Sequence, residues 1–157
     1  MTEMPLHRRV LVPKFIRYIE ERRPQPRRLL DVGCGLLDPL FKEHFKNAYL
    51  GIDIYGRHDS LADAEHLPFH DEVFDVVTAW SVIEHLRNPY LCIKEMVRVS
   101  SQFVIMTTNY TTRDIEGDPT HLYAWTPKTF KQFLELHGYP VEVSITTGIM
   151  GVMTKVN

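Results

Sequence analysis

A short apolar run that leads directly into a pair of glycines constrains this chain most. Residues 28–32 form the run, Gly33 and Gly35 follow it, and apolar residues at helical spacing continue to residue 45. This order predicts a strand, a tight turn and a helix. Glycines let the backbone of such a turn approach a ligand, and the first amides of the helix point toward it. We therefore expect a ligand at this turn.

The rest of the chain repeats the alternation of strand and helix patterns. Strands that alternate with helices predict an α/β fold with a mostly parallel sheet. Two strand patterns around Gly148 predict a C-terminal antiparallel hairpin. We expect strands at residues 28–32, 48–53, 73–80, 102–108, 141–147 and 149–156, and helices at 7–22, 36–45, 89–99 and 126–138.

One connection is too short for the usual crossover helix. Only nine residues separate Asp53 from Asp63, and parallel strands normally need a dozen or more residues to connect. The sequence thus predicts a minimal sheet with a loop in place of the helix after the second strand. The 157 residues are expected to form a single domain, 1–157, in which residues 1–26 provide an N-terminal helix and a linker.

Composition excludes several classes of protein. No apolar run approaches the roughly 20 residues that cross a bilayer, and the first 15 residues lack the continuous apolar segment of a secretory peptide. A cytoplasmic location is expected. Cys34 and Cys92 are too few and too far apart for a disulfide framework or a zinc site. No metal is expected from this pattern.

Charge is unevenly distributed. Up to residue 28 the chain carries eight Lys or Arg and three Glu, although the whole chain has a net charge of −2. A basic end can contact RNA or another polyanion. A solvated helix face is the favoured interpretation, because no nucleic-acid motif accompanies the charges.

Acidic residues around the glycine turn indicate the kind of ligand. Asp53 ends the second strand twenty residues after Gly33, where a carboxylate can accept hydrogen bonds from two ribose hydroxyls. Asp38 stands where a dinucleotide-binding turn has its third glycine, and its charge would repel a pyrophosphate. Asp31, Asp38 and Asp53 would instead suit a nucleoside with a positively charged amino-acid end and a sulfonium.

Five segments in order now carry a specific resemblance. They resemble the successive motifs of the class I S-adenosylmethionine-dependent methyltransferases, close to the type 11 group. The resemblance implies a Rossmann-like fold and methyl transfer to an O, N or C atom of a small-molecule acceptor. The segments are LLDVGCG at 29–35, GID at 51–53, DAEHLPF at 63–69, FDVV at 74–77 and VIEHL at 82–86.

The resemblance also implies a set of cofactor contacts. Two departures from the family pattern are Leu37, where a small residue is usual, and the shortened connection, which removes one wall of the adenine pocket. Trp80 could equally be packed in the core, and Asp75 is interpreted as structural. The implied contacts are Asp31, Gly33, Cys34 and Gly35 at the methionine part, Asp53 at the ribose, Ile54, Asp63 and Ala64 at the adenine, and Trp80 with Ser81 closing the site.

Candidate catalytic residues follow from the chemistry. Displacement at a sulfonium depends chiefly on holding donor and acceptor in line, and a base is optional. His121 is the first candidate base and His85 the second, although a packing or capping role is the alternative for each. Asn109 and Tyr110, just beyond the fifth strand, are candidate substrate contacts by position.

Two other functions remain open at this stage. The chain could be a non-catalytic Rossmann-like module that serves as a partner subunit, as its short connection and Leu37 suggest. It could also be an RNA methyltransferase that uses its basic N-terminus. The small size leaves little chain to cover the pocket, so the pocket is either open or completed by a second copy in a homodimer.

Overall fold

The computed structural model describes residues 6–35, 39–55, 59–108, 118–145 and 149–155. Helices and strands alternate along these ranges as the sequence pattern predicts. In chain order the structure contains α1 (Leu6–Arg22), β1 (Leu29–Val32), α2 (Pro39–Phe45), η1 (Lys46–Ala48), β2 (Tyr49–Asp53), β3 (Ser60–Leu61), β4 (Phe74–Trp80), η2 (Ile83–His85), α3 (Pro89–Val99), β5 (Ser100–Thr108), α5 (Pro127–Glu135), β6 (Val141–Ile145) and β7 (Ile149–Thr154).

The strands form one sheet with the order β3-β2-β1-β4-β5-β7-β6. Strands β1 to β5 pair in parallel, whereas β7 pairs antiparallel with both β5 and β6. The strand order reverses at β1, which lies between β2 and β4. Ligands bind at such a reversal, beyond the carboxyl ends of the strands. The predicted α/β Rossmann-like fold with a C-terminal hairpin is confirmed.

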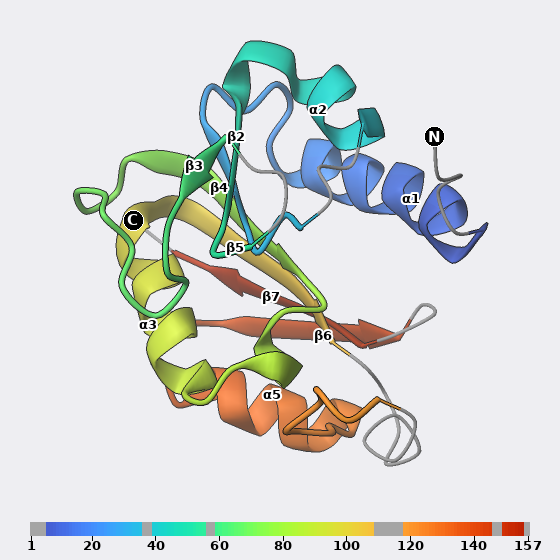
Figure 1. Ribbon diagram of the computed structural model, residues 1–157, viewed down its shortest axis with the longest axis vertical. Coiled ribbons are helices and arrows are strands. Elements are labelled where there is room, and N and C mark those ends of the chain that lie inside the picture. The colour runs from blue at the N-terminus through green and yellow to red at the C-terminus, as the bar shows by residue number, and fades with distance from the viewer. Residues whose placement is uncertain (1–5, 36–38, 56–58, 109–117, 146–148, 156–157) are drawn as a thin grey trace.

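Helices cover both faces of the sheet (Figure 1). Helices α1 and α2 lie on one side, and α3 and α5 lie on the other. Successive strand residues point to opposite faces, so in β1 Leu29 packs with α1 while Leu30 packs with the core beneath α3. Burial of the strands on both sides explains why their sequences read as apolar runs.

Local capping fixes the helix starts that the sequence predicted. The Asn88 side chain accepts a hydrogen bond from Leu91 N at 3.1 Å at the start of α3. At the start of α5, Thr126 and Thr129 cap each other's backbone amides, which satisfies groups that would otherwise lack partners. Proline follows each cap, as expected for a first helical turn.

The shortened connection contains an unexpected strand. The loop expected between Asp53 and Asp63 includes β3, which pairs in parallel with the end of β2. Asp59 supports this pairing, because its backbone N donates to Gly51 O at 2.9 Å and its carboxylate accepts from Gly51 N at 3.0 Å. A two-residue strand carries too little periodicity to be seen in the sequence.

Two predicted boundaries were wrong by a few residues. Strand β5 begins at Ser100 rather than 102, because Ser100 pairs with Phe74 of β4 and the hydroxyls of Ser100 and Ser101 both donate to backbone carbonyls. Helix α5 ends at Glu135 rather than 138. Gly138 has φ of +80°, and its amide donates to Glu135 O, so the helix closes in a turn ahead of the glycine. In the described residues, every helix is too short or too polar to cross a bilayer.

Candidate functional site

The glycine turn and Asp53 lie side by side. The Gly35 amide donates to Asp53 Oδ2 at 2.7 Å, and Cys34 N donates to Ile52 O at 3.0 Å. Gly33 and Gly35 have φ of +67° and +59°, which glycine adopts at little cost. A Cβ on Gly33 would lie 2.5 Å from Val82 Cγ2. The turn that follows β1 is therefore packed against both β2 and the segment after β4.

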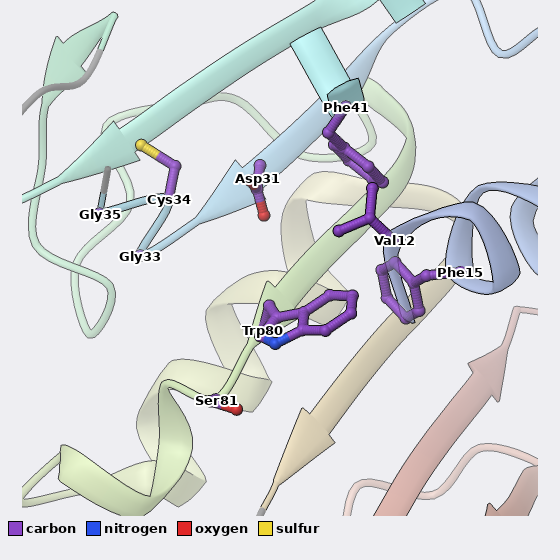
Figure 2. Close-up of a pocket in the computed structure, with 9 residues that line it drawn as sticks. All are labelled: Val12, Phe15, Asp31, Gly33, Cys34, Gly35, Phe41, Trp80 and Ser81. Carbon is purple, nitrogen blue, oxygen red and sulfur yellow. The ribbon is translucent and has the colours of Figure 1, made fainter. Parts of the chain in front are cut away.

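A cavity of about 220 Å³ opens beside this turn. Figure 2 shows the glycine turn on one side of Asp31, and a group of apolar side chains from α1, α2 and β4 on the other. Helix α1 thus contributes to the cavity as well as to the core. The lining residues are Val12, Phe15, Asp31, Gly33, Cys34, Gly35, Phe41, Trp80 and Ser81.

Asp31 is buried and held by hydrogen bonds. Its carboxylate accepts from Tyr49 Oη at 2.9 Å and from Thr78 Oγ1 at 3.0 Å. Burial, followed by the negative charges of Asp31 and other carboxylates nearby, raises the pKa of the Cys34 thiol to about 12. Burial and the Asp31 charge also raise the pKa of Tyr49. Cys34 is therefore a neutral thiol, and this end of the cavity suits a positively charged ligand.

Trp80 and Ser81 stand at the end of β4. The Trp80 ring meets the Phe15 ring edge-on, with centroids 5.2 Å apart, so Trp80 both packs against α1 and lines the cavity. Ser81 has φ of +51°, a left-handed conformation that costs a non-glycine residue energy. Its amide donates to Thr107 O at 3.1 Å, which holds the strained residue at the cavity.

The residues predicted at the adenine lie outside the cavity lining. Ile54 is 48% exposed. Asp63 accepts from Glu65 N at 2.9 Å and lies 3.5 Å from His66 Nδ1. Ala62 N donates to Asp53 O, so this segment follows directly from β3 beside the end of β2. The structure thus joins Asp53 to the glycine turn and places this turn and Trp80 in one cavity lining. Asp53 itself and the adenine candidates lie outside that lining, and the adenine candidates lie on an open flank.

The two candidate histidines meet in space. The rings of His85 and His121 are 4.6 Å apart, centroid to centroid, at 63°. Thr120 Oγ1 is 3.0 Å from His85 Nδ1, and Asp118 Oδ2 is 3.6 Å from His121 Nε2. Burial, followed by the neighbouring His121, lowers the pKa of His85. A second segment far along the chain therefore closes against the end of β4.

Glu84 joins the histidines and was missed as a site residue from the sequence. It is fully buried, and Thr108 Oγ1 donates to its Oε2 at 3.2 Å. Burial raises its pKa to about 7, against the opposing effects of its hydrogen bonds and of His121. The available signal was an acid directly before a histidine inside the motif at 82–86.

The remaining predictions are either confirmed by the structure or concern residues that the structure does not describe. Asp75 is structural, since its carboxylate accepts from Arg27 N at 2.6 Å and Arg28 N at 3.3 Å. Val12 and Phe41 were not singled out as site residues, because their apolar spacing matches ordinary core packing. The predictions for Leu37, Asp38, Asn109 and Tyr110, and the turn at Gly148, fall outside the described residues.

Comparison with known proteins identifies the family. Residues 4–142 match the family described as "Methyltransferase domain", so the chain belongs to this methyltransferase family. It is similar to ajmaline N-methyltransferase of Rauvolfia serpentina, with 29% identity over 64% of this chain and 42% of that protein. The match thus spans less than half the length of that curated relative.

Solved structures show the same fold. A SAM-dependent methyltransferase from Archaeoglobus fulgidus matches with a TM-score of 0.75 and 18% identity, over 94% of each chain. The magnesium protoporphyrin IX methyltransferase of Synechocystis PCC 6803, solved with bound SAH, matches with a TM-score of 0.71 and 13% identity, over 99% of this chain and 90% of that one. The chain therefore belongs to the methyltransferase family by its sequence and shares the fold of these solved methyltransferases.

Proposed function

We propose that this protein transfers the methyl group of S-adenosylmethionine to an O, N or C atom of a small-molecule acceptor. The observation that carries the proposal is the 2.7 Å hydrogen bond between Gly35 N and Asp53 Oδ2, next to a cavity with an apolar wall. This hydrogen bond brings the glycine turn beside Asp53, the acid that we propose binds the ribose, at the strand-order reversal where sheets of this kind bind ligands.

The residues present fit the cofactor. The space at the Cβ position of Gly33 is filled by Val82, whereas at Gly35 only Asp53 Oδ2 lies within 4.0 Å, so a ligand can approach the backbone at Gly35. Asp31 gives this end of the cavity the negative charge that the ammonium and sulfonium groups require. Asp53 would exchange its contact with the Gly35 amide for ribose hydroxyls. When bound, S-adenosylmethionine supplies an electrophilic methyl group on a positively charged sulfur.

The apolar end of the cavity indicates the acceptor class. Val12, Phe15, Phe41 and Trp80 form this end, and aromatic side chains favour flat, apolar ligands. We therefore propose an acceptor with an aromatic or similar planar part. The similarity to ajmaline N-methyltransferase, whose name indicates a small-molecule acceptor, supports this class. The protein's part in the reaction is to hold the acceptor in line and keep water out.

His121 and His85 are the proposed proton acceptors for a hydroxyl or amine that loses a proton. Both histidines lie beside Glu84. Glu84 in turn interacts with the Ser81 side chain, and Ser81 lines the cavity. The depressed pKa of His85 keeps that ring neutral near pH 7, the form that can accept a proton. Whether a base is needed depends on the acceptor atom.

The proposal is tested by binding and transfer measured on the same preparation. Calorimetric titration with S-adenosylhomocysteine should give one binding site, and incubation with methyl-labelled S-adenosylmethionine and a panel of phenols, aromatic amines and N-heterocycles should label at least one acceptor. Trp80→Ala should lower transfer more than cofactor affinity, with the exposed Tyr55→Ala as control. Binding without transfer to any acceptor would favour the non-catalytic module.

An RNA acceptor is the second candidate and is less favoured. Part of the basic N-terminal charge is already used, because Arg22 pairs with Glu142 and Arg17 with Glu21. RNA binding with a steep salt dependence would support this alternative.

We further propose that residues 1–157 act as one domain in the cytoplasm. We also propose that a second copy of the chain covers the open flank beside Ile54, and a sedimentation measurement would detect such a dimer.

A further inference from the structure

Three potential metal ligands converge at the turn that follows β4. Glu84 and His85 lie on η2, the turn that follows β4, and His121 lies on the segment that leads to α5. One ligand atom from each of the three lies within 4.8 Å of the others. No other group of three such residues is found in the part of the chain that the structure describes.

Backbone and side-chain contacts hold the two segments together. Leu122 N donates to Glu84 O at 2.7 Å, and Thr120 Oγ1 lies 3.0 Å from His85 Nδ1. Asp118 Oδ1 in turn accepts from Thr120 N at 2.9 Å. These contacts hold the two segments together around a buried Glu84, a half-buried His121 and an exposed His85.

The buried carboxylate of Glu84 lacks a partner on one side. Its Oε2 atom accepts from Thr108, but Oε1 is buried and has no hydrogen-bond partner among the described residues. An unsatisfied buried carboxylate oxygen is costly. One oxygen of this carboxylate and one ring nitrogen from each imidazole lie within 4.8 Å of one another.

We propose that Glu84, His85 and His121 bind a divalent transition-metal cation of the Zn²⁺ type. Two imidazoles and one carboxylate are a donor set that zinc accepts, with ligand distances of about 2.0–2.2 Å. Ligand atoms on one such ion lie roughly 3–4 Å apart, which small side-chain rotations reach from the present positions. Asp118, 3.6 Å from His121 Nε2, would orient that ring from outside the ligand set.

Three protein ligands leave a position open. Ser81, three residues before Glu84, lines the cavity, so the open position would be near the acceptor. An acceptor oxygen or nitrogen could then bind the cation, which would replace the two histidines in promoting proton loss from the acceptor. This part of the inference rests on the proposed function. Metal binding itself does not, because the three proposed ligands lie on η2 and on the segment before α5 rather than in the glycine turn.

The test is metal binding in the absence of S-adenosylmethionine. Chelator-treated protein is titrated with Zn²⁺ by calorimetry, and with Co²⁺ by visible absorption, which reports coordination geometry. We expect one binding site, with Co²⁺ d–d bands typical of nitrogen and oxygen ligands. Glu84→Gln and His121→Asn should each weaken Zn²⁺ binding at least tenfold, by analogy with losses of about 10–100-fold for weaker, outer contacts. His70→Ala, at an exposed histidine, should bind as the wild type does.

Folding is checked on the same variants. Far-UV circular dichroism and S-adenosylhomocysteine titration should remain as in the wild type, and Zn²⁺ should raise the melting temperature of the wild type but not of Glu84→Gln. Absence of Zn²⁺ and Co²⁺ binding in the wild type, or unchanged binding in both variants, would overturn the proposal. Failure to bind S-adenosylhomocysteine would instead count against the proposed function.

Discussion

The glycine turn and the histidine cluster, which lie at the two ends of the site, are formed by different kinds of chemical group. The glycine turn uses backbone amides and one acid, all within a short stretch of β1 and β2. The histidine cluster uses ionisable side chains, and it requires His121 to return to Glu84 from a distant part of the chain. The first is fixed by local geometry, whereas the second depends on the packing of α5. Changes in each region should therefore affect the two ends separately.

The largest separation is expected for Phe130→Ala. Phe130 is fully buried, and its ring lies 5.8 Å from that of Trp125, on the segment that carries His121. Removing a buried phenylalanine should lower the free energy of unfolding by about 4 kcal/mol. In cold, folded samples the affinity for S-adenosylhomocysteine should change less than twofold. If calorimetry shows that the affinity for S-adenosylhomocysteine falls together with the stability measured by denaturation, the two ends are not independent.

Gly33→Ala should produce the opposite pattern. Alanine at this position would keep a left-handed backbone conformation and would place its Cβ 2.5 Å from Val82. Backbone strain and overpacking together should lower the free energy of unfolding by about 3 kcal/mol. S-adenosylhomocysteine binding should be lost. The double variant Gly33→Ala with Val82→Ala should recover part of the stability, since it removes the clashing methyl groups. No recovery would mean that backbone strain, rather than the contact with Val82, accounts for the loss.

Asp53→Ala should affect binding without a comparable loss of stability. It removes the charged acceptor expected at the ribose, so S-adenosylhomocysteine should bind about 2 kcal/mol more weakly, roughly 30-fold. Asp71→Ala is the control, because Asp71 is an exposed aspartate paired with Arg98. Calorimetry that gave the same dissociation constant for both variants would remove Asp53 from the cofactor site.

The smallest effect is expected in the acid sensitivity of the α5 side. Burial lowers the pKa of His137 from 6.5 to about 4, and its Nε2 atom is buried without a partner among the described residues. Since the unfolded chain binds this proton more readily, stability should fall as pH decreases from about 6.5 toward 4. Partial exposure limits the effect to about 1 kcal/mol. His137→Phe should reduce this loss in urea unfolding at pH 7 and pH 5.

The sequence predicted the elements that have strong local signals. The strand and glycine turn at residues 28–35 and the capped helices at Pro89 and Pro127 could be read directly, because periodicity and capping act over a few residues. Strand β3 could not, since its two residues are defined by pairing with β2. The same reason applies to Glu84, whose role follows from burial and from a distant histidine.

Family resemblance supplied what local patterns could not. The charge of Asp31 indicated only a positively charged ligand, and the order of the motifs connected it with a particular cofactor. Phe15 reads as one apolar residue in an amphipathic helix, and only the fold shows that α1 brings it to the cavity. Side chains that serve both core and site are therefore the least predictable from sequence.

A crystal structure with S-adenosylhomocysteine bound is the most direct measurement. We expect the ribose hydroxyls within hydrogen-bond distance of Asp53, and the homocysteine part beside Gly33 and Gly35. A ligand bound with its sugar away from Asp53, or on another face of the sheet, would contradict the claim that the glycine turn and Asp53 bind the same nucleoside.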